Sequence, residues 1–214
     1  MKEFFDKAFT KIAVLGSGTM GGQIAAHFAN LGFETLMFDT SEEALSKSIA
    51  MMKKLKPTPF ASPSVPGLLK TSTYENLDAL SSCDFIIESI VENLDIKKKL
   101  FKQISPHVNE NAILVTNTSG LSIQKIAESA PDSLRSRIFG VHFFNPPRYL
   151  PLVELIRTSY SDESLLIKAE GFITSALGKE VVYAKDSPAF VANRIGVFSF
   201  MAVLRHAENF NLSA

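Results

Sequence analysis

The stretch Lys11–Gly22 reads KIAVLGSGTMGG, an apolar run followed by a cluster of glycines. The run IAVL is apolar on both faces, which is typical of a strand buried inside a parallel sheet. Gly16, Gly18 and Gly21 match the pattern G-x-G-x-x-G. In this pattern the glycines allow a tight turn, close approach of a pyrophosphate to the backbone, and close packing of helix on strand. The context favours a dinucleotide-binding unit, and an ordinary tight turn is the alternative.

The residues after the glycines indicate which dinucleotide would bind. A helix that begins near Thr19 and Met20 would direct free N–H groups and a positive dipole end at the phosphates. Asp39 ends the next apolar run, about 20 residues further on, where a carboxylate can bind both hydroxyls of the adenosine ribose. It would also repel a 2′-phosphate, and no arginine follows it within residues 40–43. We therefore predict that the cofactor is NAD rather than NADP. The alternative is that Asp39 only caps the next helix. No residue is assigned as a metal ligand.

Segments in which apolar residues recur with the helical period alternate along the chain with short apolar runs typical of strands. Helical stripes start at Met20, Ile96 and Leu165, and residues 57–67 are rich in Pro and Ser and are expected to form an irregular loop. Strands are predicted at Lys11–Gly16, Glu34–Asp39, Cys83–Ile90, Ala112–Thr116, Arg137–Phe144, Val153–Arg157 and Glu180–Ala184. Strands alternating with helices predict an α/β fold, here a Rossmann-type doubly wound, mostly parallel sheet.

The last 28 residues differ in character, so we predict a nucleotide-binding domain over residues 1–186 and the first helix of an incomplete all-α domain over 187–214. Ser187 is a plausible N-cap, and Pro188 suits the first helical position. Residues 195–204 carry no charge. A helix that is apolar on all sides needs cover on all sides. We expect this cover to come from a second subunit or from further domains of a longer polypeptide.

Composition excludes several classes of protein. The chain has 214 residues with 22 Lys+Arg and 22 Asp+Glu, so no basic excess suggests a nucleic-acid or membrane surface. No apolar run approaches the roughly 18–20 residues of a membrane span, and the first is too short for a secretion signal. The single cysteine, Cys83, excludes an intrachain disulfide. We expect a cytoplasmic protein with no nucleic-acid or membrane partner.

A histidine and a glutamate in the second half form a candidate catalytic pair. His142 lies near the carboxyl end of a predicted strand, where open α/β sheets bind ligands. Glu154 follows twelve residues later inside the next apolar run. A carboxylate in such a strand is costly unless paired. A pair with His142 would make a general base oriented by a carboxylate. From spacing alone, a structural histidine remains the stronger alternative.

Five separated motifs resemble a known family. They are the glycine loop, Glu88–Leu94 (ESIVENL), Asn117–Ser119 (NTS), His142–Pro146 (HFFNP) and Phe190–Arg194 (FVANR). In this order they resemble the NAD-binding part of L-3-hydroxyacyl-CoA dehydrogenases. Residues 145–150 and 55–60 further resemble the bacterial type in which this dehydrogenase is joined to an enoyl-CoA hydratase.

The resemblance implies roles for individual residues. His142 is implied to remove the proton of the substrate 3-hydroxyl, with Glu154 as its paired carboxylate. Ser119 and Asn193 are implied to hold the hydroxyl and the thioester end of an acyl-CoA substrate. The implied cofactor contacts are Glu92, Lys97, Asn117, Ser119 and Asn145. Without the family, Asn117 and Ser119 would be assigned to a turn, Asn193 to a helix surface and Lys97 to a solvated face.

The resemblance also implies an activity. This is NAD-dependent oxidation of (3S)-3-hydroxyacyl-CoA to 3-ketoacyl-CoA in fatty-acid β-oxidation. The alternatives are a 3-hydroxybutyryl-CoA dehydrogenase and a non-catalytic NAD-binding protein on the same scaffold. The segment between Asp39 and Glu88 is shorter than in stand-alone relatives, so its CoA contacts cannot be matched. Lys53, Lys54 and Lys56 are the candidates for the CoA phosphates.

Overall fold

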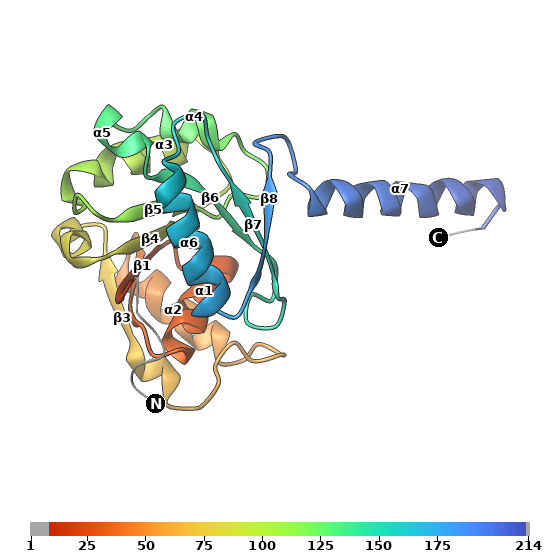
Figure 1. Cartoon of the computed structure of the whole chain (residues 1–214). Helices are drawn as coiled ribbons and strands as arrows, with labels where there is room; N and C mark the ends of the chain where they lie inside the picture. Colours follow the sequence, from red (N-terminus) through yellow and green to blue (C-terminus); the bar gives the residue numbers. More distant parts are fainter. Residues whose placement is uncertain (1–8, 213–214) are drawn as a thin grey trace.

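The computed structural model describes residues 9–212, and its centre is an eight-stranded sheet. The order across the sheet is β3-β2-β1-β4-β5-β6-β7-β8 (Figure 1). The strands are β1 (Lys11–Leu15), β2 (Glu34–Asp39), β3 (Leu69–Thr73), β4 (Phe85–Glu88), β5 (Ile113–Thr116), β6 (Ile138–Phe143), β7 (Leu152–Ile156) and β8 (Glu180–Ala184). All neighbouring strands are parallel except β6 and β7. The predicted doubly wound, mostly parallel sheet is confirmed.

Helices cover both faces of this sheet. They are α1 (Thr19–Asn30), α2 (Glu42–Met52), α3 (Leu94–Ile104), α4 (Ile123–Ala127), α5 (Asp132–Arg135) and α6 (Glu163–Ser175). The last helix, α7 (Ala192–Asn209), lies outside these layers (Figure 1). Phe28 of α1 and Phe172 of α6 belong to the apolar core on one face. Phe101 of α3 and Ile126 of α4 belong to the core on the other. Sequence-distant helices therefore share a layer, as right-handed crossovers require.

The strand order reverses at β1, and this reversal positions the ligand site. From β1 the chain runs outward through β2 to β3, then returns to place β4 on the other side of β1. The carboxyl ends of β1 and β4 therefore face the crevice in which open α/β sheets bind ligands. The glycine loop follows β1, and Glu88 ends β4.

Strand β3 was not among the predicted strands. Its sequence, LKTST, has one apolar residue, Leu69, and lacks the alternation of a half-buried strand. It forms because it lies at the edge of the sheet and pairs with β2 from Thr35↔Leu69 to Asp39↔Thr73. The residues before it behave as expected, since 53–64 contain no helix or strand and a short 3₁₀ turn follows at Val65–Leu68.

The predicted start of the last helix is wrong. Helix α7 begins at Ala192, not after Ser187. Ala189 and Phe190 have φ of 62° and 45°, so the backbone between Ser187 and the helix is left-handed and cannot belong to its first turn. The helix is capped instead by a side chain from β7.

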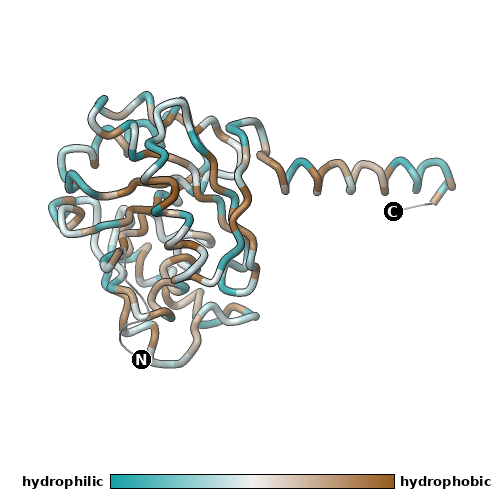
Figure 2. Tube along the Cα trace, viewed as in Figure 1, coloured by the Kyte–Doolittle hydropathy of each residue, from teal (hydrophilic) through white to brown (hydrophobic). Residues whose placement is uncertain are grey.

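Helix α7 extends away from the body of the protein (Figure 1), and hydrophobic residues recur along it (Figure 2). Among the described residues, none of those in α7 is buried. Phe198 is 75% exposed and Met201 55%. An exposed apolar surface of this kind is typical of an interface. Even so, no helix among residues 9–212 is long and apolar enough to cross a membrane.

We expect the 214-residue chain to self-associate through α7. The double change Phe198→Glu and Met201→Glu should shift it toward monomer, because charge on the apolar surface opposes its burial. Light scattering measures the mass. Ile167→Glu is the matched control, since Ile167 is 59% exposed but lies on α6. A monodisperse monomer of the unmodified chain would contradict this prediction.

Candidate active site

The glycine loop leaves open space where a pyrophosphate would lie. Gly16 has φ of +100°, and a Cβ there would lie 2.6 Å from the Ser89 carbonyl oxygen. A Cβ on Gly21 would collide with the Gly16 carbonyl, so this glycine permits the helix to pack on the loop. A Cβ on Gly18 would meet no atom within 4 Å. The exposed backbone at Gly18 and the N-terminus of α1 therefore fit a dinucleotide diphosphate.

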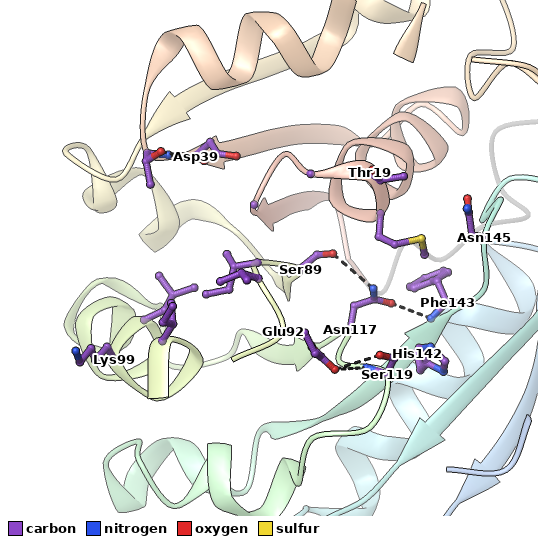
Figure 3. Close-up of a pocket in the computed structure, with 18 of the residues that line it drawn as sticks. Thr19, Asp39, Ser89, Glu92, Lys99, Asn117, Ser119, His142, Phe143 and Asn145 are labelled. Carbon is purple, nitrogen blue, oxygen red and sulfur yellow. Dashed lines mark hydrogen bonds between the residues drawn. The ribbon is translucent and has the colours of Figure 1, made fainter. Parts of the chain in front are cut away.

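This loop opens onto a pocket of about 910 Å³ along the carboxyl ends of the central strands. Asp39 and Lys99 lie toward one end of it, and His142 and Asn145 toward the other (Figure 3). The predicted residues that line the pocket are Gly16, Gly18, Thr19, Met20, Asp39, Glu92, Asn117, Ser119, His142, Asn145 and Asn193. Gly21, Lys97, Glu154 and the candidate lysines at 53, 54 and 56 are not among the lining residues.

Hydrogen bonds orient the carboxylate of Asp39 at its end of the pocket. Its Oδ2 accepts a hydrogen bond from the backbone N–H of Ser17 at 2.8 Å, and its Oδ1 accepts one from the N–H of Thr40 at 2.7 Å. Partial burial raises the pKa of Asp39, but these hydrogen bonds together with those of the Ser17 and Thr40 hydroxyls lower it below its usual value. The group is therefore ionised at neutral pH and suited to accept ribose hydroxyls.

Asp39→Ala is expected to weaken NADH binding by roughly tenfold or more, because each charge-assisted hydrogen bond to the ribose contributes about 1.5–3 kcal/mol. It should also narrow the preference for NADH over NADPH, since the repulsion of a 2′-phosphate is removed. Fluorescence titration measures both affinities. Asp78→Ala is the control, because the side chain of Asp78 is 90% exposed. Equal affinity of the unmutated chain for NADH and NADPH would contradict the assignment.

The antiparallel pairing of β6 with β7 brings the histidine and the glutamate together. His142 and Glu154 are directly opposite in the register. The Nδ1 of His142 lies 2.7 Å from Oε2 of Glu154, with the side chains 7% and 1% exposed. Since Glu154 occupies Nδ1, the ring nitrogen left for a ligand is Nε2. The pair predicted from the spacing is present and lies at the pocket.

Glu154 has a second role that the sequence did not reveal. Its Oε1 accepts hydrogen bonds from the backbone N–H groups of Val191 and Ala192, at 2.9 and 2.8 Å. These N–H groups belong to the first turn of α7, which has no cap from its own side chains. Glu154 therefore fixes the imidazole of His142 with one oxygen and the start of α7 with the other.

The remaining polar residues gather beside His142. Asn117 accepts a hydrogen bond from the N–H of Phe143 at 2.9 Å, which ties the loop after β5 to the end of β6. Ser119 donates to Oε1 of Glu92 at 3.1 Å through its hydroxyl and at 2.9 Å through its N–H. Asn193 donates to the carbonyl of Ser119 at 3.3 Å, so α7 reaches the same corner of the pocket.

Several lining residues were not singled out from the sequence. Among them are Tyr74, Lys99 and Gln103. Tyr74 follows β3, so missing that strand hid it. Its ring stacks on Phe38, with centroids 6.3 Å apart. Desolvation raises the pKa of its hydroxyl far above the usual value, so this group stays neutral. Lys99 and Gln103 are four residues apart on α3 and therefore lie on the same face of the helix, which the helical period could have predicted.

Fold and site together define a dinucleotide-binding domain of the Rossmann class, with a buried histidine–carboxylate pair at one end of its pocket. Residues 11–187 match the model of the 3-hydroxyacyl-CoA dehydrogenase NAD binding domain. The chain belongs to the 3-hydroxyacyl-CoA dehydrogenase family, and its dinucleotide is NAD.

Named relatives agree with this family. The chain is 38% identical to a probable 3-hydroxyacyl-CoA dehydrogenase of Bacillus subtilis, over 93% of this chain and 28% of that protein. It is 38% identical to a putative fatty acid oxidation complex trifunctional enzyme of Rickettsia felis, over 92% and 28%. The crystal structure of (S)-3-hydroxybutyryl-CoA dehydrogenase PaaH1 from Ralstonia eutropha matches with a TM-score of 0.77 and 35% identity, over 87% of this chain and 67% of that one. The chain thus spans little more than a quarter of the first two relatives.

Proposed function

We propose that this protein catalyses the reversible oxidation of (3S)-3-hydroxyacyl-CoA to 3-ketoacyl-CoA, as a step of fatty-acid β-oxidation. The observation that carries the proposal is the His142–Glu154 pair, 2.7 Å apart, at the same pocket that the glycine loop and Asp39 line. A dinucleotide held by its adenosine end at Asp39 would extend its nicotinamide toward His142. This is the geometry that hydride transfer next to a general base requires.

The chain's own residues would move one proton and orient one substrate. His142 Nε2 accepts the proton of the substrate 3-hydroxyl, and Glu154 stabilises the resulting imidazolium across the 2.7 Å contact. Bound NAD⁺ would supply the acceptor for the hydride that leaves C3. Ser119 and Asn193 would hold the substrate oxygens, and their position in the pocket lining with His142 supports these roles. The rings of Phe144 and Phe190 flank the imidazole, with centroids 4.6 and 5.7 Å away, and limit water around it.

A short-chain preference is the second candidate, and the similarity to the Ralstonia eutropha 3-hydroxybutyryl-CoA dehydrogenase favours it. The third is a non-catalytic NAD-binding protein on the same fold. The Rickettsia felis relative, a putative trifunctional enzyme, supports fusion to other domains. We propose an enoyl-CoA hydratase as one such domain. The exposed surface of α7 supports a partner or a second copy. We propose the cytoplasm as the location of the reaction.

The test is NADH oxidation with acetoacetyl-CoA, followed by the near-ultraviolet absorbance of NADH. The proposal expects absorbance to fall only when protein and both substrates are present. Comparing acetoacetyl-CoA with long-chain 3-ketoacyl-CoA separates the first candidate from the second. Tight NADH binding with no turnover of any of these substrates would favour the non-catalytic protein.

A further inference from the structure

A buried lysine lies directly beneath the pocket wall. The side chain of Lys97 on α3 is 1% exposed, and its Nζ lies 2.5 Å from Oε1 of Glu88, which is also 1% exposed. Oε2 of Glu92 lies 3.4 Å from the same Nζ, on a side chain that is 42% exposed and lines the pocket. Lys97 itself is not among the lining residues. We call Glu88, Glu92 and Lys97 the charge cluster.

Both carboxylates of the charge cluster are fixed by further hydrogen bonds. Glu88 accepts from the N–H of Ile90 at 2.7 Å and from the hydroxyl of Thr116 at 2.5 Å. Glu92 accepts from the hydroxyl of Thr118 at 2.6 Å and from Ser119. Such partners are what make a buried ion pair tolerable. Two carboxylates and one ammonium leave one net negative charge, and it faces the pocket through Glu92.

The position of this charge matters for a dinucleotide in the pocket. With the adenosine ribose at Asp39, the nicotinamide half reaches the corner formed by Ser119 and His142. Ser119 is hydrogen-bonded to Glu92, so the charge cluster borders this corner (Figure 3). The oxidised nicotinamide ring carries a positive charge and the reduced ring carries none, whereas the rest of the cofactor is unchanged. A fixed charge here therefore acts differently on NAD⁺ and NADH.

We propose that the charge cluster sets the relative affinity of this protein for NAD⁺ and NADH, with Lys97 acting as a positioning residue for Glu92. Lys97 offsets the charge of Glu88, holds Glu92 in place, and leaves the charge cluster with one surplus negative charge. The surplus favours the oxidised cofactor. This inference rests on the orientation of NAD assumed in the proposed function.

The test is the ratio of the dissociation constants of NADH and NAD⁺, measured by titration calorimetry. Lys97→Met adds one negative charge and should raise the ratio by about tenfold, as expected for a unit charge about 10 Å away in an effective dielectric of about 20. Glu92→Gln removes the surplus and should lower the ratio by a similar factor. The double variant Glu88→Gln, Lys97→Met restores the net charge, so its ratio should return to within about threefold of the unmutated value.

Two controls separate charge from damage to the structure. Lys98→Met makes the same chemical change on the same helix, but Lys98 is only half-buried and is not part of the charge cluster, so the ratio should change much less than in Lys97→Met. ADP-ribose lacks the nicotinamide, so its dissociation constant shows whether a variant has damaged the part of the site that binds the rest of the cofactor. If Lys97→Met does not fold, Glu92→Gln and the double variant still decide, since neither leaves Glu88 as an unpaired buried charge.

A constant ratio in Glu92→Gln overturns the proposal, whatever Lys97→Met does. Weakening of NAD⁺, NADH and ADP-ribose by the same factor in each variant also overturns it, because that result means a structural role alone. If the unmutated chain binds neither NAD⁺ nor NADH, the proposed function fails first. That outcome differs from normal binding with an unaltered ratio, which contradicts only this inference.

Discussion

His142→Gln is expected to lower kcat by about 10²- to 10⁴-fold, which is the usual contribution of a general base. Glutamine fills a similar space but cannot take up the hydroxyl proton at neutral pH. NADH binding should change little, because the glycine loop and Asp39 are untouched. The variant therefore separates catalysis from cofactor binding.

Two measurements are needed, in any form of the protein that turns over acetoacetyl-CoA. Steady-state NADH oxidation reports kcat, and fluorescence titration reports the dissociation constant of NADH. His107→Gln is the matched control, since that histidine pairs with Asp78 outside the pocket and its side chain is 33% exposed. Near-normal turnover of His142→Gln would assign the base to another residue.

Glu154→Gln is expected to lower kcat by about 10²-fold or more, because it changes which ring nitrogen of His142 carries the proton. The amide oxygen of Gln can still accept from Val191 and Ala192, which directs its NH₂ group at Nδ1 of the imidazole. That nitrogen must then accept, so the proton moves to Nε2. An Nε2 that already carries hydrogen cannot accept the proton of the substrate.

Glu154→Ala distinguishes this effect from a loss of structure. Alanine removes the cap of α7 as well, so hydrogen exchange at Val191 and Ala192 should accelerate in Glu154→Ala and stay slow in Glu154→Gln. The thermal midpoint should fall further in the alanine variant, because two N–H groups lose their acceptor. Fast exchange in both variants, with unchanged turnover in Glu154→Gln, would contradict the tautomer argument.

The local part of the site could be predicted because its causes lie in adjacent residues. The apolar run before Gly16 and the glycine spacing specify strand, turn and helix within one short segment, and the structure has all three. His142 and Glu154 follow the same logic. They lie on strands that are consecutive along the chain, so a short connection brings them opposite each other.

The helical period places Lys97 on the buried face of α3, although its charge favours a solvent-exposed position. Lys97 precedes Leu100, Phe101 and Ile104 by three, four and seven residues, which places all four on one face of α3. As one of three successive lysines, its type alone favours a solvated face. The structure instead buries Lys97 and leaves Ile96 44% exposed, because Glu88 and Glu92 supply the partners that a buried ammonium needs.

The sequence by itself determined the strand–loop–helix unit and pointed to the histidine–glutamate pair, since each depends on nearby residues, and it indicated the family through five motifs in a fixed order. Only the tertiary structure decided edge strand β3, the burial of Lys97 and the start of α7. The stabilising partners of these features come from elsewhere in the fold: β2 pairs with β3, Glu88 with Lys97, and Glu154 with N–H groups 37 and 38 residues further along the chain. Partners that come from another part of the chain leave no pattern in the local sequence. The residues that they stabilise therefore do not reveal these contacts by their own type or spacing.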